Sequence, residues 1–478
     1  MNMPKKMSNP VRFAALPFAF ALLFAAVNPA AAEKQAPPVP GKQKNFQIPK
    51  PRKRNLANGM GVTLVPYGTV PKVTLALAIR TGNIDETAEQ VWLADLVGDF
   101  LSQGTATRSA SQIAQQAADM GGEVAVNVGE DRTDLSIDVL SEFGPAAVAL
   151  LADVARNPKF PEGELARLKG DKLRQLAIAK TRPQQLVAER FRAMLYPGHP
   201  YGRLFPTNEM LQGYTVAQAK AFFDTNYGAA RTRLYVVGRF DEAGIERAIN
   251  QEFEGWKKGL APAVHVPKPN GGRRLEVIDR PGAVQSTISL GLPVVDPSSP
   301  DYIPLVVMDS LLGGSFGSRI TSNIREQKGY TYSPASQISA RYRDAFWAEN
   351  ADVTTKDTGA SLKEIFAEID RLGTEAPSEK ELRGIQNYLG GIFILRNSVR
   401  QGIIGQLEFM DLHGLPDDYL NTYVQRINAV TPAEVQRITA KYIRSGNVAI
   451  VVAGDQKVIA DQLTPYAHGS DGTPPASK

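Results

Sequence analysis

Two stretches of this sequence repeat the same pattern 216 residues apart. Residues 215–238 begin with TVAQAKAFF and end with RLYVVG, and residues 431–454 begin with TPAEVQRI and end with NVAIVVAG. Each pattern predicts a helix capped by threonine, an aromatic residue, and a β-branched strand that ends at glycine. Residues 73–80 (VTLALAIR) and 286–292 (STISLGL) form a second matching pair of predicted strands. The repeat therefore predicts an α+β protein with two homologous domains in tandem, each a mixed sheet covered by helices.

Stretches rich in Pro and Gly separate the two predicted domains from each other and from their flanks. Residues 33–53 are predicted to form a flexible lead-in, and residues 54–260 the N-terminal domain. A linker follows at 261–272 (APAVHVPKPNGG), and residues 273–466 form the predicted C-terminal domain. Residues 467–478 are rich in Gly, Ser, Pro and Thr, and this composition predicts a disordered tail.

Residues 1–32 have the features of an export signal. Three basic residues precede the apolar stretch 13–27 (FAALPFAFALLFAAV), and alanines at 30–32 form a site that a signal peptidase could cleave. The apolar stretch of 15 residues is shorter than the ~18–20 residues that a transmembrane helix needs, and a signal anchor is the alternative interpretation. We therefore expect an exported protein of the bacterial periplasm with no membrane span in the mature chain.

Composition excludes several classes of protein. The chain has 478 residues and no cysteine, which rules out disulfides, thiolate zinc sites, iron–sulfur clusters and a cysteine nucleophile. No two of its histidines (His199, His265, His413, His468) lie within five residues of each other, so a compact histidine pair for a metal is absent. Residues 1–32 hold three basic residues and no acid, so the formal charge of +5 falls to +2 without them. This near-neutral charge does not indicate a nucleic-acid-binding protein.

Residues 91–105 (VWLADLVGDFLSQGT) predict a helix with two different faces. Its apolar residues fall on one stripe at helical spacing, and Asp95 and Asp99 share the opposite face. Taken alone, two carboxylates four residues apart indicate a solvated helix face. They could also bind Mg²⁺ or Ca²⁺, but these ions require more oxygen ligands than this face offers.

The same stretch resembles the metal-binding helix of the pitrilysin/insulinase family of inverted-motif zinc peptidases, in particular its two-domain bacterial branch. In that family the helix reads approximately G-x-A-H-x-x-E-H-x-x-x-x-G-T. The resemblance places the two zinc histidines at Asp95 and Asp99, the general base at Gly98 and the distal zinc glutamate at Gln175. Zinc-dependent hydrolysis needs those ligands and a base that takes a proton from water. Their replacement implies a chain that binds no catalytic zinc and is inactive alone.

A second motif of the family is complete. Residues 311–320 (LLGGSFGSRI) and 324–333 (IREQKGYTYS) are similar to the family's second-domain signature. The resemblance makes Arg325 and Tyr332 the catalytic pair that acts across a cleft, toward the zinc-bearing domain, on the substrate carbonyl. A guanidinium and a phenol are suitable donors to such an oxygen. The alternatives are a surface ion pair for Arg325, core packing for Tyr332, and Tyr330 in the place of Tyr332.

Two further features resemble the family without being catalytic. The segment 121–128 (GGEVAVNV), continued to Thr133, is similar to the edge strand that pairs with an extended peptide, which makes Asn127 and Thr133 expected substrate-binding residues. Main-chain pairing of this kind needs no particular side chain, so a domain without zinc could still bind peptide. Residues 196–202 (YPGHPYG) match a family turn, in which we expect His199 to be structural.

Family members commonly form heterodimers in which each chain is a half-clamshell around an unfolded peptide. The resemblance therefore implies a non-catalytic subunit with peptide substrates and a homologous partner subunit, whose intact H-x-x-E-H motif holds Zn²⁺. The alternative is a peptide-binding or scaffolding protein with no associated proteolysis, and the partner could also be a second copy of this chain. A lone hydrolase that uses Asp95 and Asp99 with another metal would lack a base and a third ligand.

Overall fold

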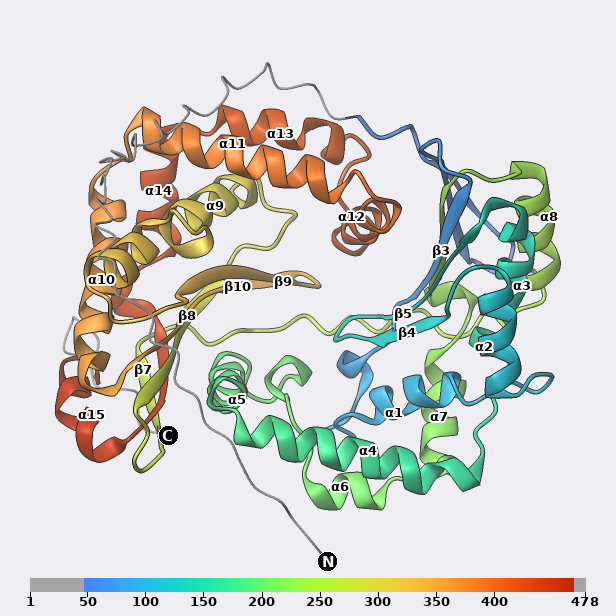
Figure 1. The fold of residues 1–478 in the computed structure, drawn as a ribbon, viewed down its shortest axis with the longest axis horizontal. Helices are drawn as coiled ribbons and strands as arrows, with labels where there is room; N and C mark the ends of the chain where they lie inside the picture. The colour runs from blue at the N-terminus through green and yellow to red at the C-terminus, as the bar shows by residue number, and fades with distance from the viewer. Residues whose placement is uncertain (1–46, 468–478) are drawn as a thin grey trace, which may run out of the picture. The chain divides into compact units, whose positions relative to one another are not determined.

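The computed structural model describes residues 47–467, which form two mixed sheets with helices packed against them (Figure 1). The predicted export signal at 1–32 lies outside the described residues, as do most of the predicted lead-in and nearly all of the predicted tail. None of the helices within residues 47–467 combines the length and the hydropathy of a membrane span.

The N-terminal sheet has six strands in the order β1-β2-β6-β3-β5-β4. The pair β2 and β6 is parallel, and the other neighbours are antiparallel. The strands are β1 (Arg52–Asn55), β2 (Gly61–Pro66), β3 (Lys72–Ile79), β4 (Ala125–Val128), β5 (Thr133–Leu140) and β6 (Thr232–Gly238).

The C-terminal sheet has five strands in the order β7-β11-β8-β10-β9. Its strands are β7 (Arg274–Asp279), β8 (Gln285–Val294), β9 (Ala335–Arg341), β10 (Asp344–Thr354) and β11 (Ala449–Gly454). Strand by strand, this order repeats the β2-β6-β3-β5-β4 part of the N-terminal sheet, with a parallel first pair and antiparallel pairs after it. The repeat confirms the prediction of two homologous α+β domains in tandem.

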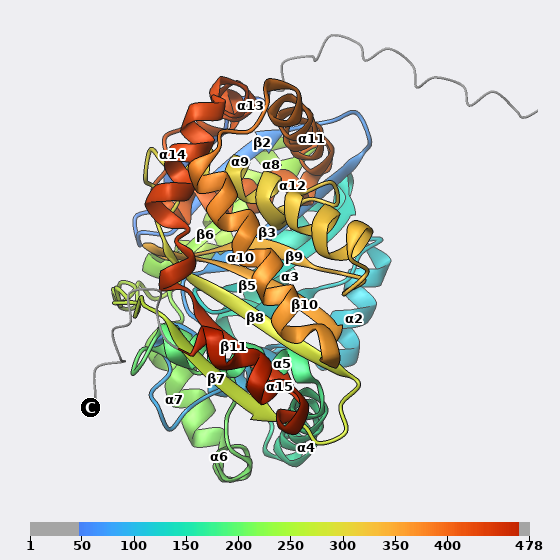
Figure 2. The same ribbon diagram turned by 90° about the vertical axis from the view of Figure 1, so that its left-hand side faces the viewer.

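Helices surround both sheets. In the first half they are α1 (Leu93–Leu101), α2 (Ala110–Asp119), α3 (Gly144–Arg156), α4 (Glu162–Thr181), α5 (Pro183–Leu195), α6 (Asn208–Gly213), α7 (Val216–Asn226) and α8 (Glu242–Phe253). In the second half they are α9 (Tyr302–Asp309), α10 (Thr358–Thr374), α11 (Glu379–Arg396), α12 (Arg400–His413), α13 (Tyr419–Ala429), α14 (Pro432–Tyr442) and α15 (Gln456–Leu463). Figure 2 shows α15 beside β7.

The repeated sequence pattern forms the same local structure twice. The Thr215 hydroxyl accepts a hydrogen bond from the N–H of Gln218 at the start of α7, and Thr431 does the same at the start of α14. Both helices also have the reciprocal bond of a capping box, which satisfies two otherwise unpaired N–H groups. The strands that follow, β6 and β11, are central and buried, which explains their continuous apolar sequence.

Each sheet also contacts a helix from the other half of the chain. α5 packs against β8 and β11, where the ring of Phe191 meets that of Phe346 edge-on at 5.7 Å between centroids. α12 packs against β3 and β6, and Arg400 Nη2 at its start lies 2.8 Å from Asp138 Oδ1. This exchange joins the two predicted domains in one compact unit.

The end of the predicted lead-in is built into the fold. Ile48 is buried in the core of the C-terminal domain, and its N–H donates to Asn421 Oδ1 at 3.1 Å. Strand β1 begins at Arg52, inside the range predicted to be flexible. Between α8 and β7 the chain has neither helix nor strand over 254–273, a stretch that the structure describes in full and that includes the predicted linker.

Candidate functional site

The helix that the resemblance matches to the family's zinc-binding helix is α1, and its apolar stripe is buried as the sequence predicts. Leu93, Leu96 and Val97 belong to the core of the N-terminal domain, whereas Asp95 and Asp99 are only half-buried on the other face. The two carboxylates do not share a bound group, because each has its own partner.

Asp99 forms an ion pair with a lysine that reaches it from α4. Lys172 Nζ lies 2.9 Å from Asp99 Oδ2, and only 6% of Lys172 is exposed. Burial raises the pKa of the Asp99 carboxyl, and the charge and hydrogen bond of Lys172 act in the opposite direction. The cation beside residue 99 is therefore an ammonium group of the chain itself.

Asp95 belongs to a hydrogen-bonded group at the start of α1. The Asn83 side-chain amide donates to Asp95 Oδ2 at 2.8 Å and to Glu86 Oε1 at 3.1 Å. Glu86 Oε1 also accepts from the N–H of Ala94 at 2.8 Å, so it satisfies a free donor of the first helical turn. Burial raises the pKa of Glu86 to about 8.

Gly98, the position that the resemblance assigns to the general base, leaves no room for a side chain. A Cβ at Gly98 would overlap Cγ2 of Val128 on β4, which packs directly against this point of α1. Gln175 lies on α4, one turn after Lys172, and its side chain is exposed.

These residues do not fit a catalytic zinc ion. Zinc in such a site needs neutral imidazoles, a carboxylate and an open position for water. Here a buried ammonium neutralises one aspartate, an amide holds the other, and the base position is filled by Val128. Among residues 47–467, no group of three or more His, Cys, Asp or Glu side chains is arranged to hold a metal ion.

The second motif places its two predicted residues in contact. Arg325 Cζ lies 4.6 Å from the ring centroid of Tyr332 and 4.6 Å from that of Phe316. Both rings are on the surface, because Phe316 is 69% exposed and Tyr332 is 77% exposed. A guanidinium held against aromatic faces keeps its edge N–H groups available to a ligand.

The backbone around this pair is distinctive. Arg325 lies on a π-helical segment, η6 (Thr321–Gln327), and a second π-helical segment, η5 (Ser310–Gly314), precedes Phe316. π-Helical turns are rare and occur often at functional sites. Arg325 Nε also lies 3.0 Å from Glu326 Oε1, so the surface ion pair coexists with the aromatic contacts. Tyr330 packs against the core of its domain, which leaves Tyr332 as the tyrosine beside Arg325.

Strand β4 forms one free edge of the N-terminal sheet among the described residues, and β1 forms the other. Asn127 lies on this strand, opposite Asp134 of β5, and its side chain is exposed. Thr133 lies on β5 instead, where it is buried and its hydroxyl donates to the carbonyl oxygen of Thr81 at 2.9 Å. Only the first of these two expected substrate-binding residues is therefore at the free edge.

The turn that contains His199 joins the two halves of the chain. His199 Nδ1 accepts from the N–H of Tyr201, which is a local contact within the turn. Tyr196 donates to Asp344 of β10, and the Tyr201 hydroxyl donates to Asp131 Oδ1 at 2.5 Å. The turn thus connects α5 to strand β10 of the other half of the chain, a contact that the sequence alone did not predict.

Comparison with known proteins identifies the family. Residues 62–205 match the model described as insulinase (peptidase family M16), and residues 213–389 match the model described as the peptidase M16 inactive domain. The chain belongs to the insulinase family of peptidases. Within this family, the chain has Asp95, Gly98 and Asp99 on α1 and the Arg325–Tyr332 contact in its second half.

Relatives and solved structures agree with this assignment. A protein named uncharacterized zinc protease from Rickettsia felis is 27% identical over 351 residues, 71% of this chain and 81% of the relative. The uncharacterized zinc protease YmxG of Bacillus subtilis is 24% identical over 374 residues, 74% of this chain and 88% of the relative. A crystal structure described as the peptidase M16 inactive domain of Pseudomonas fluorescens aligns with a TM-score of 0.78 and 25% identity, over 84% of this chain and 98% of that one. A protease from Helicobacter pylori shares the fold, with a TM-score of 0.80 and 18% identity. The alignment covers 85% of this chain and 100% of that one.

Two residues of the site were missed in the sequence. Lys172 stands three residues before Gln175 in the same predicted helix, so a basic residue one turn away from a lost zinc ligand was the available signal. Phe316 stands within the glycine-rich part of the second motif, where a large apolar residue is unusual for a turn.

Proposed function

We propose that this chain is the exported, non-catalytic subunit of a zinc metallopeptidase. Its partner would be a homologous chain with an intact H-x-x-E-H motif, and this chain would contribute Arg325 and Tyr332. Membership of a peptidase family and the match to a domain described as inactive support the proposal. The features of residues 1–32 support its export to the periplasm.

The contrast between the two motifs carries the proposal: Arg325 and Tyr332 are in contact, whereas the residues at the predicted zinc positions are engaged with other partners. Arg325 and Tyr332 are already in contact and the Tyr332 ring is exposed, which an ordinary structural cation–π contact does not require. The zinc helix is altered at every ligand position, and Lys172 occupies the position of a cation. Arg325 and Tyr332 can contribute to peptide hydrolysis only if another chain provides the zinc ligands and the general base.

The contribution of this chain would be to bind and orient the peptide. A guanidinium has donors in a fixed plane, and a phenol adds one more, so both can donate to the carbonyl oxygen of the bond to be cleaved. Donors placed before the reaction stabilise negative charge on that oxygen and typically contribute ~10²–10³ in rate. The partner subunit would supply zinc and the general base.

The test is the peptidase activity of the reconstituted complex. We expect Arg325→Ala and Tyr332→Phe to lower kcat at least tenfold while the complex still assembles, as measured by size-exclusion chromatography. Arg383→Ala is the matched control for the first variant, because Arg383 is an exposed arginine on α11 outside the motif. Tyr330→Phe is the control for the second. Full activity of both motif variants would refute the catalytic contribution.

A scaffolding or peptide-binding function without proteolysis is the second candidate. The exposed edge of β4 favours it, because an extended peptide can add to a free edge through main-chain hydrogen bonds alone. Equal binding of an unfolded peptide by the wild-type chain and by Arg325→Ala, without hydrolysis in any captured complex, would support this candidate over the first.

A further inference from the structure

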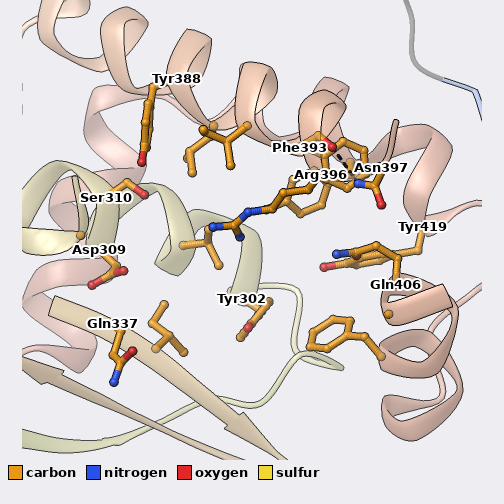
Figure 3. Close-up of a pocket in the computed structure, with 18 of the residues that line it drawn as sticks. Tyr302, Asp309, Ser310, Gln337, Tyr388, Phe393, Arg396, Asn397, Gln406 and Tyr419 are labelled. Carbon is orange, nitrogen blue, oxygen red and sulfur yellow. Dashed lines mark hydrogen bonds between the residues drawn. The ribbon is translucent and has the colours of Figure 1, made fainter. Parts of the chain in front are cut away.

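The C-terminal domain contains a cavity that neither motif explains. It has a volume of about 510 Å³ and lies between α9, η5 and β9 on one side and α11, α12 and α13 on the other. Figure 3 shows side chains from both sides that point into it, among them Asp309, Tyr302 and Arg396. The cavity is distinct from the Arg325–Tyr332 contact, since neither of those residues lines it.

Arg396 brings a positive charge into this cavity. It stands at the last position of α11, and Figure 3 shows its side chain extending from the helix into the cavity, on the side of Ser310 and Tyr302. The structure gives its guanidinium no hydrogen bond or ion pair with any of residues 47–467. By contrast, Arg400, four residues later, is held by Asp138 and Thr74. The Arg396 donors are therefore available to a ligand.

Aromatic rings form much of the wall around this charge. Tyr302 of α9, Tyr388 of α11, Phe409 of α12 and Tyr419 of α13 all line the cavity. Rings of this kind bury apolar surface and accept a stacked guanidinium or side chain. A ligand with an apolar or aromatic body next to a negative group would match this lining.

The other charged group of the wall is Asp309. Its Oδ1 accepts from Ser336 Oγ at 2.6 Å and from Trp347 Nε1 at 2.8 Å, and it is 92% buried, with 8% exposed. No donor from residues 47–467 reaches its Oδ2, so this oxygen can accept from the N–H of a ligand. Arg396 and Asp309 form no ion pair with each other. The cavity thus offers a donor fork and a separate acceptor.

We propose that this cavity binds the C-terminal residue of a peptide. The α-carboxylate would pair with the Arg396 guanidinium, the last amide N–H would face Asp309, and the terminal side chain would lie among the aromatic rings. Guanidinium and carboxylate match in a bidentate, charge-assisted geometry, which is a common way to recognise such a group. A free carboxylic acid with an aromatic body has the same chemistry, and the test separates these two sources.

The proposal does not rest on the function proposed for Arg325 and Tyr332. Tyr388 also lines a neighbouring apolar cavity that includes Phe316, so the two cavities meet at this tyrosine. A peptide held at Arg396 could extend past Tyr388 toward Phe316. Binding can be measured on this chain alone, so its failure and the failure of the catalytic proposal are distinguishable.

The experiment is a fluorescence anisotropy titration of the purified mature chain, without a partner. The probes are a labelled unstructured decapeptide that ends in phenylalanine with a free carboxylate, and the same peptide with a C-terminal amide. We expect the acid to bind about ten- to a hundredfold more tightly, the range of a charge-assisted hydrogen bond. Arg396→Met should remove the difference, and Arg383→Met on the same helix should keep it.

Competition with N-acetylphenylalanine identifies the source of the carboxylate. If N-acetylphenylalanine displaces the labelled peptide only at a far higher concentration than the unlabelled peptide does, the ligand is a peptide terminus. If it does so at an equal or lower concentration, the cavity is reassigned to a small carboxylic acid. Equal binding of acid and amide by the wild type would overturn the proposal. So would an unchanged preference in Arg396→Met, provided that its melting temperature matches that of Arg383→Met.

Discussion

The guanidinium carbon of Arg325 lies 4.6 Å from the ring centroid of Tyr332, and the ring of Phe316 contacts the same guanidinium at the same distance. The half-buried Arg325 on η6 and the exposed rings of Phe316, which follows η5, and Tyr332, which follows η6, thus form one preorganised group. Two exposed aromatic rings on one guanidinium form an apolar surface of the kind that marks interaction sites, which is the physical basis for expecting this group to contact a substrate.

Phe316→Ala is expected to loosen Arg325 without removing it. A cation–π contact contributes about 0.5–2 kcal/mol, so the activity of the reconstituted complex should fall by roughly 2- to 30-fold. Steady-state kinetics would check this change. Leu395→Ala is a suitable control, because Leu395 is also an exposed apolar residue but lies outside the motif. Unchanged activity in Phe316→Ala would show that the ring does not position Arg325.

Lys172→Met is expected to destabilise the fold, because Asp99 would lose its buried counter-ion. Removing one partner of a fully buried pair costs about 3–5 kcal/mol, and since Asp99 is a third exposed we expect about 2 kcal/mol at pH 7. Without Lys172, the pKa of the Asp99 carboxyl, already raised by burial, should rise further. The carboxyl therefore takes up a proton as the pH falls, and the difference in unfolding free energy between variant and wild type should become smaller. Urea unfolding at several pH values measures both effects. Lys180→Met, an exposed position of the same helix, should change the free energy of unfolding little.

Gly98→Ala tests whether the base position is closed. Alanine normally stabilises a helix by up to about 1 kcal/mol relative to glycine, but here its Cβ would overlap Val128. We therefore expect a net destabilisation of about 1–3 kcal/mol, as for other overpacked cores. Val128→Ala should relieve it, so the double variant would be more stable than the sum of the two single effects. Simple additivity in thermal unfolding would contradict the close packing of α1 against β4.

Glu349→Gln is expected to reduce the pH dependence of stability. Glu349 is fully buried, neither of its carboxyl oxygens has a hydrogen-bond partner within residues 47–467, and burial and the charge of Asp309 raise its pKa well above the usual range. A raised carboxyl pKa means that the folded chain holds a proton which the unfolded chain releases, so stability is lost as the pH rises. The free energy of unfolding of the wild type should decrease between about pH 5 and pH 8. The decrease in the variant should be smaller by at least about 1 kcal/mol. An identical decrease would show that Glu349 does not titrate with unfolding.

The sequence predicted the fold wherever a local rule determined it. The capped helices after Thr215 and Thr431 and their glycine-terminated strands follow from hydrogen-bond and β-propensity rules that act within a few residues. The exchange of α5 and α12 between the halves depends on contacts between residues hundreds of positions apart, and periodicity contains no information about them. The same reason explains why Ile48, in a Pro-rich segment, was expected to be flexible and is instead buried.

The candidate site was predictable to a similar extent. The motif singled out Arg325 and Tyr332, but their contact with each other and the contact of Arg325 with Phe316 needed the structure. The resemblance drew attention to Asp95 and Asp99, but Lys172, the ion-pair partner of Asp99, is on another helix. No local pattern in the sequence singles out Arg396. Its position in a cavity and the lack of a hydrogen-bond partner for its guanidinium among residues 47–467 are evident only in the structure.

We propose that this chain supplies one half of a zinc peptidase and that its partner supplies the other. The most direct test is affinity capture of the tagged mature chain from a periplasmic extract, followed by native mass spectrometry of what it retains. We expect an equimolar complex with a relative that carries H-x-x-E-H, one zinc ion per pair, and no zinc on this chain when the two are separated. Recovery of the chain alone, or of zinc bound to the separated chain, would contradict the account.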